Sequence, residues 1–158
     1  MPETYLAPFF SDNFQLKVKL QQHQTRIYFR VLNCHCTTSS LPQTCSILEH
    51  FLPGLCHHQC FNNKQIPFLK EAQNTEVGHL FEHILLEYLY LLKNNSHQHH
   101  PIHKGETVWD WKEEEKGIFH ITIDIGSSEM DTLTQALDQG IRLLGLIVRP
   151  QKQGNVSV

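Results

Sequence analysis

The stretch TEVGHLFEHILLEYLYLL, residues 75–92, decides the fold because it carries the strongest periodic signal in the chain. Asn74 or Thr75 suits a helix N-cap, and Glu76 falls in the first turn, where the helix dipole favours an anion. The sequence predicts a helix from about Thr75 to about Leu92 that packs on its apolar side. Its apolar residues recur three and four positions apart and comprise Val77, Leu80, Phe81, Ile84, Leu85, Leu89 and Leu92.

A polar stripe interrupts this apolar helix. His79 and His83 are four residues apart, which places both imidazoles on the same side of an α-helix, close enough to share one metal ion. Neutral imidazole suits zinc, and the carboxylate of Glu82 beside them can take a proton from a water molecule. The order H-x-x-E-H is that of the inverzincin metallopeptidases. Glu87 continues the stripe and is expected to orient one of the metal ligands without binding the metal itself.

A second interpretation of the same residues needs no metal. The chain contains 12 His, and such a composition produces H-x-x-E-H by chance roughly once in sixteen sequences. His79 and His83 can then be histidines satisfied by core or solvent contacts, with Glu82 as an ordinary surface charge. The metal interpretation also requires a third ligand, because catalytic zinc normally has three protein ligands and one open position.

The strand predicted at Ile118–Ile125 offers candidates for this third ligand. Both Asp124 and His120 lie on the polar side of the strand and carry atoms that bind zinc. Asp124 is the preferred candidate because inverzincins complete their site with a later carboxylate. The alternation places Ile121, Ile123 and Ile125 on one face and His120, Thr122 and Asp124 on the other.

The remaining pattern predicts two hairpins and two further helices. Leu16–Leu20 and Ile27–Leu32 suit paired strands, and so do Thr107–Trp111 and Ile118–Ile125 around a charged turn. A short helix ends at Pro53, and a final amphipathic helix precedes the C-terminal tail. Strands and helices in this order predict an α+β fold of two layers, with a mainly antiparallel sheet covered on one face by helices.

Length and composition set limits on the class of protein. With 158 residues, of which 40% are hydrophobic, the chain fits one domain, residues 1–148, followed by a polar tail, residues 149–158. A net charge of -3 provides no basic surface that neutralises phosphates, so no nucleic acid partner is expected. The N-terminus lacks a secretory signal pattern, and no apolar run approaches the roughly 20 residues that span a bilayer. We therefore expect a soluble, cytoplasmic protein with no membrane partner.

The cysteines are a second potential source of metal ligands. Five Cys without a secretory signal favour reduced thiols or metal ligands over disulfides. One interpretation is a structural zinc site formed by Cys34, Cys36, Cys56 and Cys60. The alternative, which the spacing favours, is that Cys34 and Cys45 are small buried side chains and that His58 and Cys60 fix a turn.

Several further landmarks occur in order around the helix motif. They are Leu52-Pro53-Gly54-Leu55, His58 and Cys60 in an H-x-C turn, Phe68-Leu69, Thr75, Gly78 to Ile84, Glu87, Glu106-Thr107 and a strand followed by Asp124. This order resembles the N-terminal domain of cyanophycin synthetase, over roughly residues 14–148 and most strongly between Leu52 and Glu87. The chain departs from the family at residues 97–104, where a His-rich segment replaces an Arg- and Gly-rich stretch.

The resemblance carries expectations about function. In that family the domain precedes an ATP-grasp domain and a Mur-ligase-like domain, which build an aspartate backbone and attach arginine to its side chains with ATP. This chain has no G-x-x-x-x-G-K-[ST] loop for ATP phosphates, so we do not expect a complete synthetase. The resemblance implies a polymer-docking role and, as in some members, a metallopeptidase-like site that cuts cyanophycin into primers. It also implies His79 and His83 as ligands, Glu82 as general base and Asp124 as third ligand.

Three functions follow from these observations. The first is a zinc-dependent hydrolase of peptide or isopeptide bonds in cyanophycin or a similar polymer. The alternative is a non-catalytic module that binds a polymer or a partner protein and keeps a vestigial metal site. A third is other metal chemistry, since S-ribosylhomocysteine lyase has a similar helix completed by a Cys, a part that Cys56 or Cys60 could take.

Overall fold

The strands form a single antiparallel sheet. The computed structural model describes residues 3–32, 36–57, 66–94 and 103–149. Within these ranges six strands pair in the order β1-β3-β4-β6-β5, and β2 also pairs with β3. The strands are β1 (Thr4–Tyr5), β2 (Phe9–Phe10), β3 (Phe14–Leu20), β4 (Thr25–Val31), β5 (Gly105–Val108) and β6 (Ile118–Ile123).

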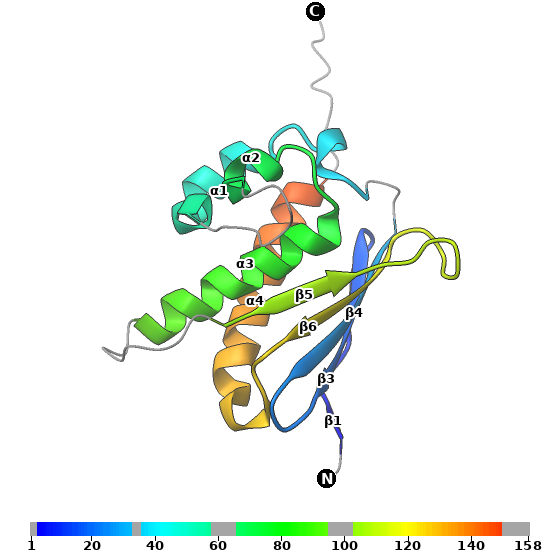
Figure 1. The fold of residues 1–158 in the computed structure, drawn as a ribbon, viewed down its shortest axis with the longest axis vertical. Helices are drawn as coiled ribbons and strands as arrows, with labels where there is room; N and C mark the ends of the chain where they lie inside the picture. Colours follow the sequence, from blue (N-terminus) through cyan, green and yellow to red (C-terminus); the bar gives the residue numbers. More distant parts are fainter. Residues whose placement is uncertain (1–2, 33–35, 58–65, 95–102, 150–158) are drawn as a thin grey trace, which may run out of the picture.

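Helices cover one face of this sheet. The two longest, α3 and α4, pack against each other and lie on the same side of the sheet (Figure 1). The predicted α+β class, with a mainly antiparallel sheet and helices on one face, is confirmed. The helices are α1 (Thr44–Phe51), α2 (Phe68–Glu71), α3 (Val77–Asn94) and α4 (Met130–Val148), with short 3₁₀ helices η1 (Thr38–Ser40), η2 (Pro53–His57) and η3 (Ser127–Glu129).

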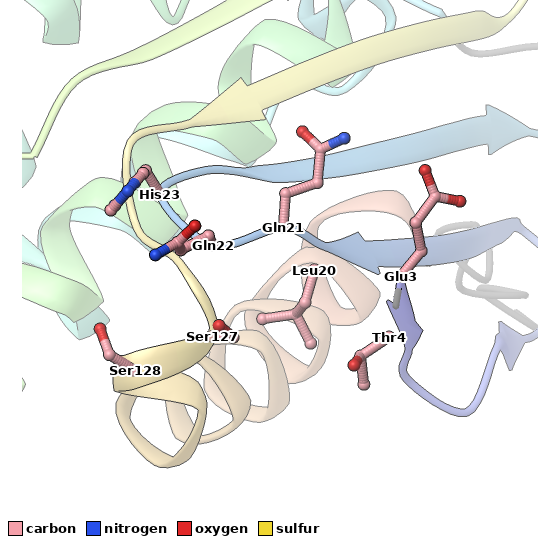
Figure 2. A pocket seen from close by; sticks show the side chains of 8 residues that line it. All are labelled: Glu3, Thr4, Leu20, Gln21, Gln22, His23, Ser127 and Ser128. Carbon is pink, nitrogen blue, oxygen red and sulfur yellow. The ribbon is translucent and has the colours of Figure 1, made fainter. Parts of the chain in front are cut away.

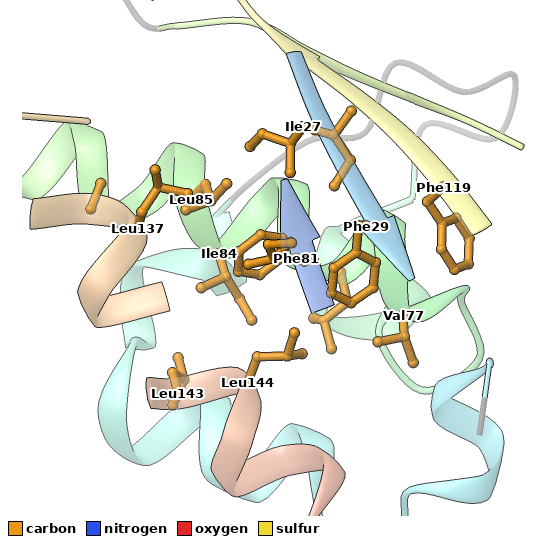
Figure 3. Close-up of a cluster of buried hydrophobic side chains, with 14 of the residues drawn as sticks. Ile27, Phe29, Val77, Phe81, Ile84, Leu85, Phe119, Leu137, Leu143 and Leu144 are labelled. Carbon is orange, nitrogen blue, oxygen red and sulfur yellow. The ribbon is translucent and has the colours of Figure 1, made fainter. Parts of the chain in front are cut away.

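Close packing at the centre of the domain fixes α3 against the sheet. Phe81 of α3 stacks on Phe29 of β4, with ring centroids 5.4 Å apart (Figure 3). Gly78 lies so close to β6 that an added Cβ would be 2.3 Å from Cγ of Phe119. On the other side Gly140 brings α4 into close contact with α3. These contacts direct the polar stripe of α3 towards β5 and α2.

Strand β6 shows the alternation that the sequence predicts. Ile121, Ile123 and Ile125 are buried in the core, whereas His120 and Asp124 are exposed on the opposite face of the sheet. Both predicted hairpins are confirmed as well, because β3 pairs with β4 and β5 pairs with β6 in antiparallel register.

Strand β5 differs from its prediction. It begins at Gly105 and ends at Val108 rather than continuing to Trp111, because Asp110 starts a turn. The carbonyl oxygen of Asp110 accepts a hydrogen bond of 2.8 Å from the N–H of Glu114. The sequence did not predict β1, β2 or α2, since segments of two to four residues are too short to show a period.

Two further expectations concern the chain as a whole. The predicted polar tail, residues 149–158, lies outside the described residues except for Arg149, and the division into one domain and a tail stays a prediction. In the part of the chain that the structure describes, no helix is both long and apolar enough to cross a bilayer.

Candidate metal centre

The start of α3 is tied to the segment around η1. The N–H of Val77 donates a hydrogen bond of 2.8 Å to the carbonyl of Cys36, and the N–H of Thr75 donates one of 2.9 Å to Oγ1 of Thr38. Thr75, expected near the N-cap, precedes the first residue of the helix, and its hydroxyl oxygen lies 2.9 Å from Nδ1 of His79. This contact orients the imidazole and leaves Nε2 of His79 for another partner.

His79 and His83 point at each other across one helical turn. Their Nε2 atoms lie 3.2 Å apart, and their ring planes are inclined at 80°. Two nitrogens bound to one tetrahedral zinc ion, each about 2.0–2.1 Å from it, lie about 3.3 Å apart. The predicted placement on one side of the helix is confirmed, and the separation fits a shared ion.

The carboxylate of Glu82 lies buried beside the two histidines. Its Oε2 is 3.9 Å from Nε2 of His83, and its Oε1 accepts a hydrogen bond of 2.8 Å from Oγ1 of Thr107 on β5. The backbone of β5 also packs against this side chain, because a Cβ on Gly105 would be 2.8 Å from Cγ of Glu82. Strand β5 therefore fixes the position of the carboxylate.

Phe68 of α2 fixes the ring of His83. The two rings are stacked, with centroids 3.8 Å apart and planes inclined at 17°. Phe68 is completely buried, so its own position is set by the core. A flat apolar partner of this kind restricts rotation of the imidazole about its long axis and excludes water from one of its faces.

Burial determines the charge state of His79. It lowers the pKa of the imidazole below its ordinary value of 6.5, an effect that the carboxylates of Glu71 and Glu76 oppose. Oε1 of Glu71 lies 4.0 Å from Nδ1 of His79, on the side opposite to the shared Nε2 contact. The imidazole is thus neutral near neutral pH, which is the form that binds a metal ion.

These three residues form a group that can hold a metal ion. One ligand atom from each of His79, Glu82 and His83 lies within 4.8 Å of the other two. Imidazole nitrogen with carboxylate oxygen is a donor set that zinc accepts, and the separation of the two nitrogens fits tetrahedral geometry. The arrangement can therefore bind a divalent transition metal next to a fixed carboxylate.

Asp124, the predicted third ligand, is not brought into this group. Its Oδ1 accepts hydrogen bonds from the backbone N–H of Lys104 at 2.8 Å and from Nδ1 of His103 at 3.0 Å. The alternation along β6 places it on the face of the sheet opposite to the buried side that α3 covers. His120 lies on the same exposed face and pairs with Glu114. Ligation by Asp124 stays a prediction that this geometry does not support.

Glu87 is buried one turn beyond His83. An added Cβ on Gly54 would be 2.0 Å from Oε1 of Glu87, so the carboxylate packs directly against the backbone of η2. Glu87 thereby connects α3 to the segment that precedes α2. Its predicted role in orienting a metal ligand stays a prediction.

Several predicted ligands lie outside the described residues. These are His58 and Cys60, together with Cys34 of the alternative structural zinc site. Of the cysteines whose side chains the structure describes, Cys36 is buried, and Cys45, predicted to be a small buried side chain, is partly buried.

Sequence reasoning missed the contributions of Thr107, Gly105 and Phe68 to this site. In the sequence, Glu106-Thr107 and Phe68-Leu69 stand out only as landmarks in the order of motifs. A usable signal for the first two was the register of the predicted hairpin, which places Gly105 and Thr107 on the same face as Ile123 and Ile121. No comparable signal exists for Phe68, because α2 is a helix of four residues.

The structure also has a hollow that none of the predicted site residues lines. It has a volume of about 660 Å³ and lies between the turn after β3 and the start of α4 (Figure 2). The residues around it are Glu3, Thr4, Leu20, Gln21, Gln22, His23, Ser127 and Ser128. The candidate metal centre therefore stands apart from this hollow.

Comparison with known families gives a match over residues 26–148 of the chain, and the family is described as the cyanophycin synthase-like N-terminal domain. A search of curated proteins found no significant match. The matched segment begins in β4, ends with α4 and includes His79, Glu82, His83 and Thr107. Because this match covers most of the sequence, the chain belongs to the cyanophycin synthase-like N-terminal domain family.

Proposed function

We propose that this protein is a zinc-dependent hydrolase of peptide or isopeptide bonds in cyanophycin or a similar polymer. One observation carries the proposal: Nε2 of His79 and Nε2 of His83 converge to 3.2 Å beside the carboxylate of Glu82. This group lies in a chain whose family is described by reference to cyanophycin synthase.

Each residue of the group has a role in the proposed reaction. His79 and His83 would hold zinc, which when bound would polarise the scissile carbonyl and make a water molecule easier to deprotonate. Glu82 accepts the proton of the attacking water and donates it to the leaving amine. Because Thr107 occupies Oε1 of Glu82, the oxygen that faces His83 is Oε2. The neutral state of His79 favours binding of the metal near neutral pH.

A specific observation favours a second candidate function. A hydrolytic zinc site normally uses three protein ligands and a separate base, whereas the group of described residues has three members. If Glu82 takes the third coordination position, the group retains no carboxylate that can act as base. The second candidate is therefore a non-catalytic module that binds the polymer or a partner protein.

Metal content tests the site itself. The protein is purified without a histidine tag, and zinc is measured by mass spectrometry in the wild type and in His79→Ala. We expect bound zinc in the wild type and its loss in the variant, since one imidazole ligand is removed. His120→Ala serves as control, because this histidine is exposed and pairs with Glu114. Equal zinc in the wild type and in His79→Ala would exclude the metal centre.

Turnover separates the two candidate functions. Glu82→Gln is assayed for cleavage of cyanophycin and of peptides, with its zinc content measured in parallel. A general base predicts retained zinc with turnover reduced by about 100-fold or more. Loss of zinc together with turnover would identify Glu82 as a ligand. Wild-type protein that binds the polymer without cutting it would support the binding module instead.

A further inference from the structure

Among the described residues, strand β5 pairs with β6 alone and so forms an open edge of the sheet (Figure 1). The N–H of Asp124 donates a hydrogen bond of 3.0 Å to the carbonyl of Lys104, which fixes the alternation of bonds along this pair. Glu106, two residues further on, likewise directs its backbone groups towards β6. The backbone N–H and C=O groups of Gly105 and Thr107 therefore point away from β6, out of the open edge.

These outward backbone groups lie beside the candidate metal centre. The side chain of Thr107 donates its hydrogen bond to Glu82, and Gly105 packs against the same glutamate. The pattern of exposure along β5 agrees with this placement. Gly105 and Thr107 are half-buried on the side of α3, while Glu106 and Val108 are exposed. The open edge and the carboxylate of Glu82 thus share one flank of the domain.

No described residue pairs with the outward backbone groups of Gly105 and Thr107. A strand edge in this condition is a template for another extended chain, and backbone pairing of this kind is a common mode of peptide recognition. Proteins often blunt such edges with charged side chains, proline or a bulge. Strand β5 has the sequence Gly-Glu-Thr-Val, which contains no proline and one charged residue, Glu106.

We propose that the open edge of β5 binds the backbone of a linear polypeptide as an added strand, next to Glu82. The identity of the occupant rests on the proposed function: an aspartate backbone that carries arginine in amide linkage on its side chains. An added strand places successive side chains on opposite faces, so every second side chain faces α3 and its metal group. The edge thereby aligns the polymer with the residues proposed to cut it.

Glu106 provides charge complementarity for that occupant. It lies on the exposed face of β5, and its carboxylate has no ion pair with a described residue. The neighbouring residue of an added strand has its Cβ about 4.5–5.5 Å from that of Glu106, on the same face. A guanidinium group carried there forms charge-assisted hydrogen bonds with the carboxylate.

Two variants at one position test the role of the edge. The probe is a fluorescein-labelled oligomer of aspartate with arginine on each side chain, and its binding to metal-free protein is followed by anisotropy. Thr107→Val and Thr107→Pro both lose the hydroxyl, but only proline loses the outward N–H while leaving the β5–β6 ladder intact. We expect Thr107→Pro to bind the oligomer about tenfold more weakly than Thr107→Val, because both variants lack the hydroxyl and differ in the outward N–H. Equal affinities of these two variants would overturn the proposal.

Methylation of the probe gives an independent test that does not depend on the folding of a variant. N-methyl groups on alternate amides leave one hydrogen-bonding edge of an extended strand free, whereas methyl groups on all amides leave none. We expect the alternately methylated oligomer to bind and the fully methylated oligomer to lose binding. Retained binding of the fully methylated oligomer, or equal loss for both, would show that no strand is added.

Charge and turnover complete the test. Glu106→Gln should weaken binding of the arginine-bearing oligomer about threefold, as expected for an exposed ion pair. Binding and cleavage are measured separately, so the two proposals fail in different ways. Binding that follows the methylation pattern without any cleavage removes the hydrolase alone. Cleavage with affinities insensitive to Thr107→Pro and to methylation removes the added strand alone.

Discussion

Oγ1 of Thr107 donates a hydrogen bond of 2.8 Å to Oε1 of Glu82, and this bond joins the edge strand of the sheet to helix α3. Both residues are shielded from solvent to a large degree, and Gly105 closes off the space behind the carboxylate. A hydrogen bond to a charged group in such a setting is worth about 1.5–3 kcal/mol. Thr107 is therefore a positioning residue for the proposed base.

Loss of the Thr107 hydroxyl should slow the reaction without releasing the metal. Thr107→Val is expected to lower kcat about tenfold, because the carboxylate of Glu82 becomes free to rotate. Thr107→Ser keeps the hydroxyl and should restore most of the activity. The measurement is kcat and KM on cyanophycin together with zinc content. Equal losses in the valine and serine variants, or loss of zinc, would contradict a positioning role.

Close approach of α3 to the sheet makes Gly78 sensitive to substitution. A Cβ at this position would be 2.3 Å from Cγ of Phe119, so Gly78→Ala is expected to destabilise the fold by about 1–3 kcal/mol. Gly145 on α4 is a matched control, because no atom lies within 4 Å of its added Cβ. Gly145→Ala should stabilise the protein by about 0.5–1 kcal/mol through helix propensity. Urea unfolding measures both, and two effects of the same sign would contradict the packing.

Much of the fold was predictable because its long elements carry clear periods. The spacing of apolar residues along α3 and α4, and the alternation along β6, reflect surfaces that bury one side. The turn at Asp110 was missed because the alternation of Trp109 and Trp111 extends past the end of β5. Both tryptophans pack on Phe119, with ring centroids 5.5 Å from it, although neither belongs to the strand.

The site was predictable only where its residues share one helix. His79, Glu82 and His83 are set by the geometry of α3 alone, whereas Thr107 and Phe68 reach the site through tertiary packing. The case of Asp124 differs, since its alternation with the buried isoleucines already placed it away from the helical face. The resemblance to inverzincins implies a late carboxylate as third ligand, whereas the alternation along β6 places the side chain of Asp124 on the other face of the sheet.

Acidification should lower the free energy of unfolding of the metal-free protein, in part through His79. Burial lowers the pKa of His79 in the folded state, whereas the same imidazole in the unfolded chain has a pKa of about 6.5. Between these two values the unfolded state binds more protons, so the contribution to stability is complete above about pH 6.5 and is lost as pH falls through the folded pKa.

The measurement is urea unfolding of EDTA-treated protein at a mildly alkaline and a mildly acidic pH, for the wild type and for His79→Asn. We expect the loss of unfolding free energy on acidification to be smaller in the variant, which has no imidazole at this position. The difference between proteins isolates His79 from the other histidines of the chain. An identical pH dependence in both proteins would show that the imidazole titrates normally.

Zinc should stabilise the folded protein through His83 and independently of Asp124. Zinc at about 100 times its dissociation constant adds about 2.7 kcal/mol, which corresponds to an increase in Tm of roughly 5–10 °C for a chain of this size. His83→Ala should abolish the shift, since it removes one of the two converging nitrogens. Asp124→Asn should retain it, because an amide oxygen still accepts the hydrogen bond from the N–H of Lys104. Loss of the shift in Asp124→Asn, with its metal-free Tm unchanged, would instead establish Asp124 as the third ligand.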